Sequence, residues 1–500
     1  MRREAYEYIC KYIHGGHVKD NNIQSYLDKF LNAEFGLAHP FQSNGDLEKK
    51  FIYMIDLIRK QDIIIKLLSK QTETSDKIGL LRRWTEFKNT FWRLIIGDPN
   101  TIYNDLYARE ELSDQIQQFS NFINRVKGGT EYTDIGLPGR LFIDVTSTSR
   151  TNYLSGIQRV VFEITKKLMG PNVYPAIIHP DGLFSINKST SEFEKVRFQK
   201  NDVFLMADAS IDCADNLSAI IADNSASGGI NVTFVYDLIP LNYPLTCGAA
   251  IPYKFHNWFN RCALKCDLIL TNTKCVMEQV QQYSEMNYKG NQTLAEVNFF
   301  HLGSELPSDT SNWHCTKINN FMDSQRNIFL SVGTIEPRKG YSISLDAAEF
   351  AWNKGEDFIF VIVGRYGWNQ VCVRERILLH REYNKRLFWY NNMDDGDLSS
   401  LYKISRSLIF ASIDEGFGLP LMEAAQHDLP VIVSDIPVFR EIAGPNAVYF
   451  EAANSNNLAE KIIQACHSPK NSSKIETISW DRSKLELLSH IKNVIEARRN

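Results

Sequence analysis

The pattern of apolar and polar positions divides the chain into a helical first part and an alternating second part. Residues 1–135 carry apolar positions at helical spacing, most clearly over Asp46–Lys70 and again from Trp84 to Ile95. From residue 136 onwards, short apolar runs alternate with helical patterns and glycine-bearing loops. The pattern predicts an all-α segment followed by two α/β domains.

The first α/β domain is expected over residues 136–310, after a linker at Gly128–Gly139. Its first strand, Leu141–Val145, is apolar almost throughout, which is typical of a parallel strand buried on both faces. The polar stretch Thr146–Ser155 is expected to be a loop, and Gly156 opens a helix after it. Further strands are predicted at Val203–Met206, Val232–Val235, Leu268–Leu270 and Val297–Leu302, with a helical pattern over Ala249–Cys266.

The second α/β domain is expected over residues 311–475. A helix is predicted over Tyr341–Lys354, and a final helix in residues 476–500 should turn Leu485, Leu488, Ile491 and Ile495 to one side. Both domains are expected to be doubly wound parallel sheets. In the second, strands are predicted at Ile328–Val332, Phe358–Val363, Leu387–Tyr390, Ser407–Ile413, Val431–Val433 and Val448–Phe450.

The stretch Asp414–Ala424 carries the strongest chemical signal. Glu415 and Glu423 are separated by seven residues that include two glycines and a proline, between a predicted strand and a predicted helix. Gly416 and Gly418 allow the backbone to approach a ligand closely, and a helix N-terminus favours an anion. Carboxylates beside an anion site predict binding of a ligand with both hydroxyl and phosphate groups.

Composition and charge narrow the classes of function. The net charge of −4 and the pI of about 6.3 give no overall basic field that would attract nucleic acid. The chain contains no apolar run of the roughly 18 residues that a membrane span needs, and Met1–Tyr8 lacks the apolar core of a signal peptide. Nine scattered cysteines indicate reduced thiols, so a cytoplasmic location is expected.

The N-terminal segment contains as many Lys and Arg as Asp and Glu, so it does not resemble a polybasic membrane anchor. Its apolar stripe Trp84–Ile95 fits packing within a helical bundle. The same stripe could dock on the cytoplasmic face of a membrane or on a protein partner, and both alternatives remain open.

The motif E-G-F-G-L-P-L-M-E-A at Glu415–Ala424 resembles the donor-site motif of retaining GT-B glycosyltransferases, in particular family 4, the glycosyl transferases group 1. S-G-I-Q-R-V-V around Gly156 resembles the G-I-x-R loop of that family, and Gly333–Gly340 resembles its phosphate loop. The resemblance covers about residues 140–500. It implies two facing Rossmann-like domains and a C-terminal helix that crosses back to the first.

The resemblance also implies roles for individual residues. Glu423 would bind the ribose hydroxyls, Glu415 the hydroxyls of the transferred sugar, and Arg338 with Lys339 the departing diphosphate. A metal would not be required, because these cations meet the developing charge. The expected catalytic residues are Glu415, Lys339, Arg338 and Asp237. The expected donor-binding residues are Gly156, Arg159, Gly333, Thr334, Glu415, Gly416, Phe417, Gly418, Leu419 and Glu423.

Several of these positions have alternative interpretations. Asp237 could simply cap the turn that follows it, and Arg159 could be a solvated helix residue. Tyr236 stands where many family members have His, and Thr334 where many have a second Arg. Asp395-x-Asp397 resembles a metal-binding D-x-D, but the helical spacing of the residues after it favours a helix cap instead.

The resemblance favours transfer of a hexose to a glycan or lipid-linked glycan in bacterial surface-polysaccharide synthesis, such as O-antigen synthesis. GDP-mannose is the favoured donor, with UDP-hexose and dTDP-rhamnose as alternatives. A different class of function is a catalytically idle GT-B scaffold or regulatory subunit. A GT-B epimerase or phosphorylase is a third.

Overall fold

The computed structural model describes residues 112–128, 134–151, 156–188, 190–287, 295–305, 325–368, 370–470 and 474–498. The chain divides into a unit of Met1–Asn104 and a unit of Asp105–Asn500, and all the described residues belong to the second. The helices predicted over Asp46–Lys70 and Trp84–Ile95 lie outside the described residues.

The first α/β domain is built on an eight-stranded sheet in the order β4-β3-β2-β1-β5-β6-β7-β8. Six neighbouring strands, β2-β1-β5-β6-β7-β8, are parallel. β3 and β4 add an antiparallel edge beside β2. The strands are β1 Leu141–Asp144, β2 Val173–His179, β3 Gly182–Ile186, β4 Phe193–Lys195, β5 Val203–Met206, β6 Ile230–Val235, β7 Leu268–Thr271 and β8 Glu296–Phe299.

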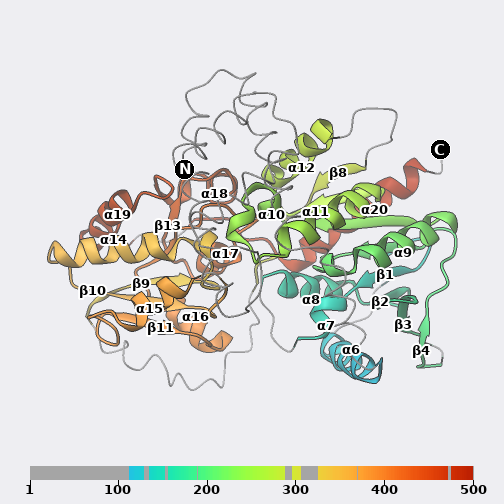
Figure 1. The fold of residues 1–500 in the computed structure, drawn as a ribbon, viewed down its shortest axis with the longest axis horizontal. Coiled ribbons are helices and arrows are strands. Elements are labelled where there is room, and N and C mark those ends of the chain that lie inside the picture. The colour runs from blue at the N-terminus through green and yellow to red at the C-terminus, as the bar shows by residue number, and fades with distance from the viewer. Residues whose placement is uncertain are drawn as a thin grey trace, which may run out of the picture. The chain divides into compact units, whose positions relative to one another are not determined.

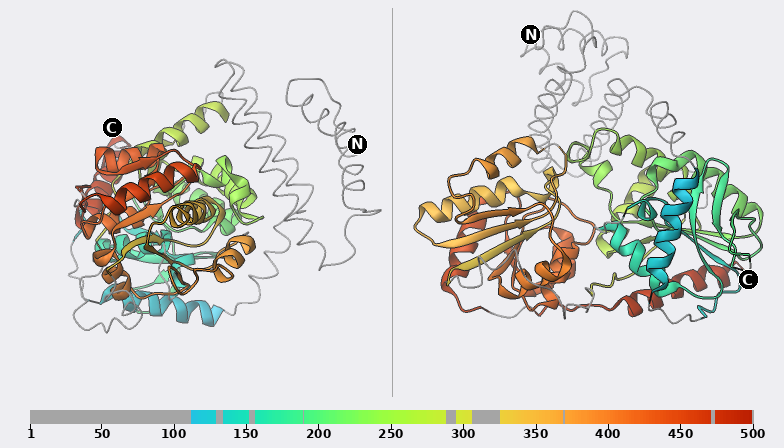
Figure 2. Two further views of the ribbon diagram at one scale, coloured as in Figure 1. Left: turned by 90° about the vertical axis from the view of Figure 1, so that its left-hand side faces the viewer. Right: turned by 90° about the horizontal axis from the view of Figure 1, so that it is seen from below.

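Helices cover both faces of this sheet (Figures 1 and 2). Alternate residues of β1 and β5 contribute to two separate apolar cores, one with α8 and α20 and the other with α9, α11 and α12. The helices are α7 Thr146–Ser149, α8 Ile157–Leu168, α9 Ala214–Ala226, α10 Ile239–Asn242, α11 Ile251–Arg261, α12 Lys274–Asn287 and α20 Trp480–Ala497, with one-turn 3-10 helices η1 Ile211–Cys213, η2 Pro244–Thr246 and η3 Ala263–Lys265.

The second α/β domain has a six-stranded, all-parallel sheet in the order β11-β10-β9-β12-β13-β14. This is the Rossmann order, which changes direction between β9 and β12. The strands are β9 Asn327–Val332, β10 Phe358–Val363, β11 Leu387–Tyr390, β12 Ser407–Phe410, β13 Val431–Ser434 and β14 Val448–Phe450.

One face of this sheet packs on α14, α15 and α19, and the other on α16, α17 and α18. Because β9 and β10 are buried on both faces, their sequences are nearly continuous apolar runs. The helices are α14 Tyr341–Asn353, α15 Val371–Leu378, α16 Asp395–Ile404, α17 Leu419–Gln426, α18 Pro437–Ala443 and α19 Ser455–His467, with η4 Pro337–Lys339 and η5 Gly444–Asn446.

Helix α6, Leu112–Lys127, packs on the first α/β domain, although we assigned it to the N-terminal segment. Its apolar residues recur at helical spacing, and the ring of Phe122 lies 6.0 Å from that of Phe162 on α8. The boundary expected at residue 135 is therefore too late. The buried apolar residues of α6 are Phe119, Phe122, Ile123 and Val126.

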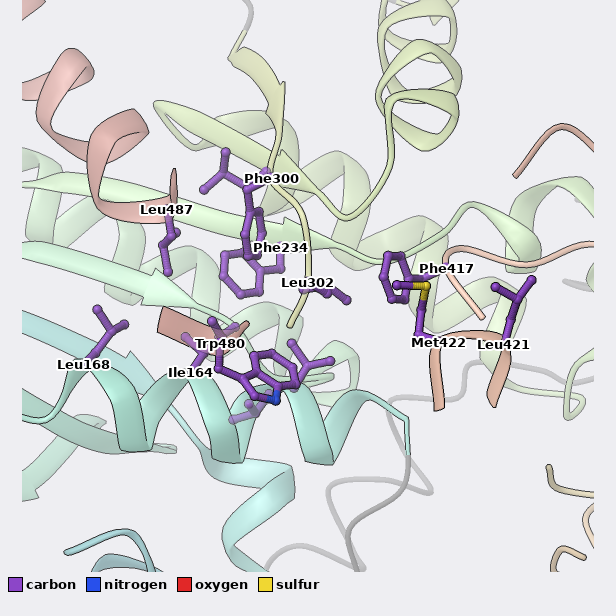
Figure 3. Close-up of a cluster of buried hydrophobic side chains, with 14 of the residues drawn as sticks. Ile164, Leu168, Phe234, Phe300, Leu302, Phe417, Leu421, Met422, Trp480 and Leu487 are labelled. Carbon is purple, nitrogen blue, oxygen red and sulfur yellow. The ribbon is translucent and has the colours of Figure 1, made fainter. Parts of the chain in front are cut away.

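The C-terminal helix α20 packs on α8 of the first domain. Trp480 at its start is 2% exposed and fills the space beside Gly303, where an added Cβ would come within 2.4 Å of the indole. Figure 3 shows this indole near Ile164 and Leu302. The prediction that Leu485 belongs to the apolar face of this helix is wrong, because Leu485 is 67% exposed. Leu487 is buried in the core instead.

The sequence did not predict the edge of the first sheet or the structure of the loop after β1. β2 contains Pro175, which pairs in register with Ile143, and an internal proline argues against a strand assignment. The stretch expected to be a loop from Thr146 begins with the single turn of α7. Asp144 stabilises this turn, because its Oδ1 accepts hydrogen bonds from the backbone N and the Oγ1 of Thr146.

Asp144 and Asp208 form a buried acidic pair at the carboxyl ends of the adjacent strands β1 and β5. Asp208 accepts the backbone N–H of Thr148 at 2.6 Å. Burial, followed by the nearby charge of Asp144, raises the pKa of Asp208 to about 7. Burial also raises the pKa of Asp144. The folded protein therefore binds protons here that the unfolded chain releases.

This pair predicts that the protein loses stability as the pH rises from about 4 to about 7. The folded pKa of Asp208 lies above its ordinary 3.8, so its stabilisation is complete below that value and is lost as the pH passes about 7. We expect Asp208→Asn to flatten the pH dependence of the free energy of unfolding, measured by urea denaturation. Asp223→Asn, at an exposed position in the same domain, should keep the wild-type slope. Equal slopes for wild type and Asp208→Asn would contradict the assignment.

Candidate functional site

The turn between β12 and α17 requires its two glycines. Gly418 has φ +100° and lies against the rings of Phe410 and Phe439. A Cβ added to Gly416 would come within 2.0 Å of the carbonyl oxygen of Tyr236, which belongs to the first domain. The Thr273 hydroxyl, also from the first domain, donates to the Gly416 carbonyl at 3.1 Å. The backbone of Gly416 thus lies directly against the first domain, at the Tyr236 carbonyl and the Thr273 hydroxyl.

Glu415 is an ionised carboxylate held by three donors. Its Oε2 accepts from Arg338 Nη1 at 2.8 Å, and its Oε1 accepts from Lys339 Nζ at 2.6 Å and from Ser412 Oγ at 2.7 Å. Burial alone would raise the pKa of Glu415, but the two cations outweigh it and lower the pKa to about 2. The residue is 6% exposed.

The loop after β9 supplies both cations. The Tyr341 hydroxyl donates to the carbonyl of Gly333, which has φ +141°. Gly340 has a left-handed backbone, and a Cβ there would lie 2.1 Å from the Ala411 carbonyl oxygen. Arg338 and Lys339 form the one-turn helix η4 between these glycines. The loop can therefore pack directly on the end of β12.

Arg338 is shared between two buried carboxylates. Besides Glu415 it contacts Glu336, whose Oε1 lies 2.7 Å from Nη2. Burial lowers the pKa of Arg338, but Glu415 and Glu336 more than offset this, so its pKa is raised. Burial, followed by repulsion from Arg338, lowers the pKa of Lys339.

Glu423 lies on α17, about one and a half turns after Gly418, and both of its carboxylate oxygens accept hydrogen bonds. Oε1 accepts from Arg159 Nη1 at 2.9 Å, and Oε2 accepts from the Tyr402 hydroxyl at 2.8 Å. Arg159 also donates from Nη2 to Asp395 Oδ1 at 3.0 Å. Arg159 is therefore a contact of the site and not a solvated helix residue.

The first domain brings Tyr236 and Asp237 against Gly416 and Arg159 against Glu423, whereas Gly156 precedes the helix that carries Arg159. Gly156 is the N-cap of α8 and has φ +49°. Tyr236 donates its hydroxyl to the Ala207 carbonyl at 2.6 Å, which directs it into the first domain. Asp237 accepts the backbone N–H of Ile239, so the expected turn cap is present.

Asp237 nevertheless lies within the charged group. Burial raises its pKa, and Arg338 opposes this effect from the other domain. Burial likewise raises the pKa of Asp414 to about 7, and the charge of Asp237 contributes to this shift. Two carboxyls with raised pKa values therefore adjoin the ionised Glu415, an arrangement that is common where protons are exchanged.

The remaining expected residues lie beside the site with less specific contacts. Thr334 and Gly333 follow β9, Phe417 is 8% exposed within the core, and Leu419 is the first residue of α17. Asp394 is the N-cap of α16, because its Oδ1 accepts the backbone N–H of Asp397 at 2.8 Å, and a helix cap was expected here. Among the described residues, no group of three or more His, Cys, Asp or Glu could hold a metal ion.

Sequence reasoning missed four residues that support the site: Ser412, Glu336, Tyr341 and Tyr402. Ser412 lies just before the Asp414–Ala424 stretch and Glu336 lies within the Gly333–Gly340 loop, but nothing in their spacing shows that they contact Glu415 or Arg338. Tyr402 is fully buried on α16, at helical spacing from Leu398, and would be assigned to the core. Its hydroxyl finds a partner only in the folded chain.

Residues 317–479 match the family model described as Glycosyl transferases group 1. The chain therefore contains a glycosyl transferases group 1 domain over these residues. All the residues of the β12–α17 turn and the Gly333–Gly340 loop lie within the group 1 domain, and Arg159, Tyr236 and Asp237 lie outside it.

Two curated relatives are mannosyltransferases. The serotype-specific mannosyltransferase WbdA of Escherichia coli is 34% identical over 364 residues, which cover 68% of this chain and 44% of that protein. The O-antigen chain mannosyltransferase RfbU of Salmonella typhimurium is 32% identical over 125 residues, covering 25% of this chain and 34% of that protein. The match thus spans less than half the length of either relative.

The fold is also that of solved structures with little sequence identity. The α,α-trehalose-phosphate synthase (UDP-forming) from Burkholderia xenovorans has a TM-score of 0.51 and 10% identity over 72% of this chain and 100% of that chain. The two sheets and the helices on both of their faces make two Rossmann-like domains. The group 1 domain and the domain before it therefore have the GT-B fold, as expected. In the described part of the chain, no helix is long and apolar enough to cross a membrane.

The buried ion pair predicts a specific pattern of stability changes. Arg338→Met leaves Glu415 and Glu336 buried without this partner and should destabilise the fold by about 3 kcal/mol. Adding Glu415→Gln to this variant should restore part of the loss, because one buried charge is then removed. The measurement is the free energy of unfolding of the two single variants and the double variant.

Arg440→Met is the matched control for this cycle. Arg440 pairs with Asp435 at 2.7 Å, and their side chains are 53% and 44% exposed. Breaking this exposed pair should change the free energy of unfolding much less, because solvent screens the two charges. If Arg338→Met is no more destabilising than Arg440→Met, the buried network does not contribute as described.

Proposed function

We propose that this chain is a retaining hexosyltransferase that moves mannose from GDP-mannose to a glycan or lipid-linked glycan in surface-polysaccharide synthesis. The observation that carries the proposal is the arrangement of Glu415, Glu423, Arg338 and Lys339. Two carboxylates and two cations meet at one strand-to-helix turn of a group 1 domain. These are the groups needed to hold hydroxyls and a diphosphate together.

In the proposed complex, each group contacts a different part of the donor. Glu423 accepts hydrogen bonds from the vicinal ribose hydroxyls, and Glu415 accepts them from hydroxyls of the transferred sugar. The backbone N–H groups of Phe417, Gly418 and Leu419 at the start of α17 face the sugar and phosphate. Glu415 is suited to this role because its low pKa keeps it an acceptor at neutral pH.

Arg338 and Lys339 are proposed to stabilise the nucleoside diphosphate as it leaves. Their fixed positive charges perform the task that a divalent cation performs in other transferases, so we propose that transfer does not depend on a metal. The acceptor attacks from the face that the phosphate leaves, and the phosphate oxygen takes the acceptor proton. The configuration of the anomeric carbon is then retained.

The names of the relatives support mannose, since WbdA and RfbU are both described as mannosyltransferases. RfbU is further described as acting on the O-antigen chain, which favours a polysaccharide or lipid-linked acceptor. An acceptor of this kind would place the protein at the cytoplasmic face of a membrane, as a peripheral protein.

The decisive experiment incubates the full chain with GDP-mannose, UDP-glucose and dTDP-rhamnose in separate reactions containing EDTA and measures release of nucleoside diphosphate. We expect release of GDP from GDP-mannose, and a product with a synthetic mannoside acceptor should show an α-anomeric NMR signal. Release from UDP-glucose or dTDP-rhamnose alone would correct the donor. No release, with no binding of any donor, would favour the idle scaffold.

Variants of the two glutamates should differ in the step that they affect. Glu415→Gln loses a charge that holds the sugar and orients both cations, so turnover should fall at least about 10²-fold. Glu423→Ala should chiefly raise KM for the donor, because ribose contacts are formed before the reaction and persist through it. Lys167→Gln, whose exposed pair with Asp481 lies elsewhere on α8, should behave as wild type. Near-normal kinetics in both glutamate variants would refute the site.

A further inference from the structure

Both carboxylate oxygens of Glu423, the residue proposed to bind the ribose, already accept hydrogen bonds from protein groups. The Arg159 guanidinium and the Tyr402 hydroxyl take one carboxylate oxygen each, at 2.9 and 2.8 Å. The Glu423 side chain is 10% exposed and that of Arg159 is 17% exposed. The carboxylate is therefore nearly buried, and Arg159 occupies Oε1, where a ribose hydroxyl would have to bind.

The covering group comes from the other domain. Arg159 lies in the first turn of α8, which packs on the first sheet, and Glu423 lies on α17 of the second sheet. We propose that Arg159 gates the donor site by occupying the ribose position on Glu423 until a nucleotide displaces it. This inference rests on the proposed function, since it takes Glu423 as the ribose-binding residue.

A ribose hydroxyl can replace Arg159 on Glu423, because Arg159 gives this carboxylate a single N–H, on Oε1, and a hydroxyl can donate to the same oxygen. An exchange avoids leaving the nearly buried Glu423 charge without a partner, which would cost several kcal/mol. Tyr402 need not move, since it binds the other oxygen from within α16.

Arg159 also keeps a partner after it leaves Glu423. Its Nη2 donates to Asp395 Oδ1 at 3.0 Å, and the Asp395 side chain is 44% exposed. The guanidinium can therefore remain on the solvent-facing carboxylate while Glu423 receives the ribose. Glu423 and Asp395 thus give the Arg159 guanidinium one partner in the closed state of the gate and one in the open state.

A gate of this kind lowers the apparent affinity for the nucleotide. When the binding-competent state is only a fraction of the total, the observed Kd is the intrinsic Kd divided by that fraction. Removing the guanidinium makes Glu423 available in every molecule. Donor affinity should then increase, whereas loss of an ordinary donor-binding residue would decrease it.

The test measures Kd for GDP and for UDP by isothermal titration calorimetry on wild type, Arg159→Met and Arg159→Lys. Arg159→Met keeps most of the aliphatic stem but has no donors, and should bind the preferred nucleotide about fivefold more tightly or better. Arg159→Lys keeps the charge but not the fork, so its Kd should lie between those of wild type and Arg159→Met. If Arg159→Met does not fold, the Kd of Arg159→Lys alone tests the gate. Lys167→Gln, on the same helix, should match wild type.

The outcomes separate this inference from the proposed function. If wild type binds a nucleotide and Arg159→Met binds it equally or less tightly, the gate is refuted and the proposed function stands. If Arg159→Met does not fold, a Kd for Arg159→Lys that is not below that of wild type refutes the gate equally. If wild type and Lys167→Gln bind neither GDP nor UDP, the proposed donor site fails and the gate fails with it.

Discussion

The site depends on one buried anion, Glu415. Its three donors come from the end of β12 and from the loop after β9, so the carboxylate joins two loops of adjacent strands. The Ile413 backbone N–H donates to the Arg338 carbonyl at 2.8 Å and strengthens the same connection. Burying the anion without these donors would be too costly, so the loop conformations and the ionisation of Glu415 are mutually dependent.

The charge at this point also determines the state of its neighbours. Burial raises the pKa values of Glu336, Asp237 and Asp414, and the nearby cations, which also contact Glu415, offset only part of this effect. The site thus combines one carboxylate that stays ionised with others that hold protons more readily. An incoming diphosphate meets fewer negative charges than the sequence alone would suggest.

The sequence predicted most of the fold and the position of the site, because both rest on local signals. Apolar runs located β5 and β11 to the residue, and the glycines at 416 and 418 marked the turn. Contacts between distant side chains carry no such signal. Nothing in α8 shows that Arg159 lies against Glu423, or in α16 that the Tyr402 hydroxyl completes the same carboxylate. Pro175 disfavours a strand but is accommodated in β2, and the apolar face of α6 does not show on which domain the helix packs.

Glu441 has a consequence that extends beyond the site. From α18 of the group 1 domain, its two carboxylate oxygens accept the backbone N–H groups of Lys274 and Cys275 at 2.7 Å each, at the start of α12 in the other domain. One domain thus completes a helix of the other through peptide groups alone. Every residue except proline supplies such an N–H group, so this contact requires the carboxylate of Glu441 but no particular side chain at positions 274 and 275.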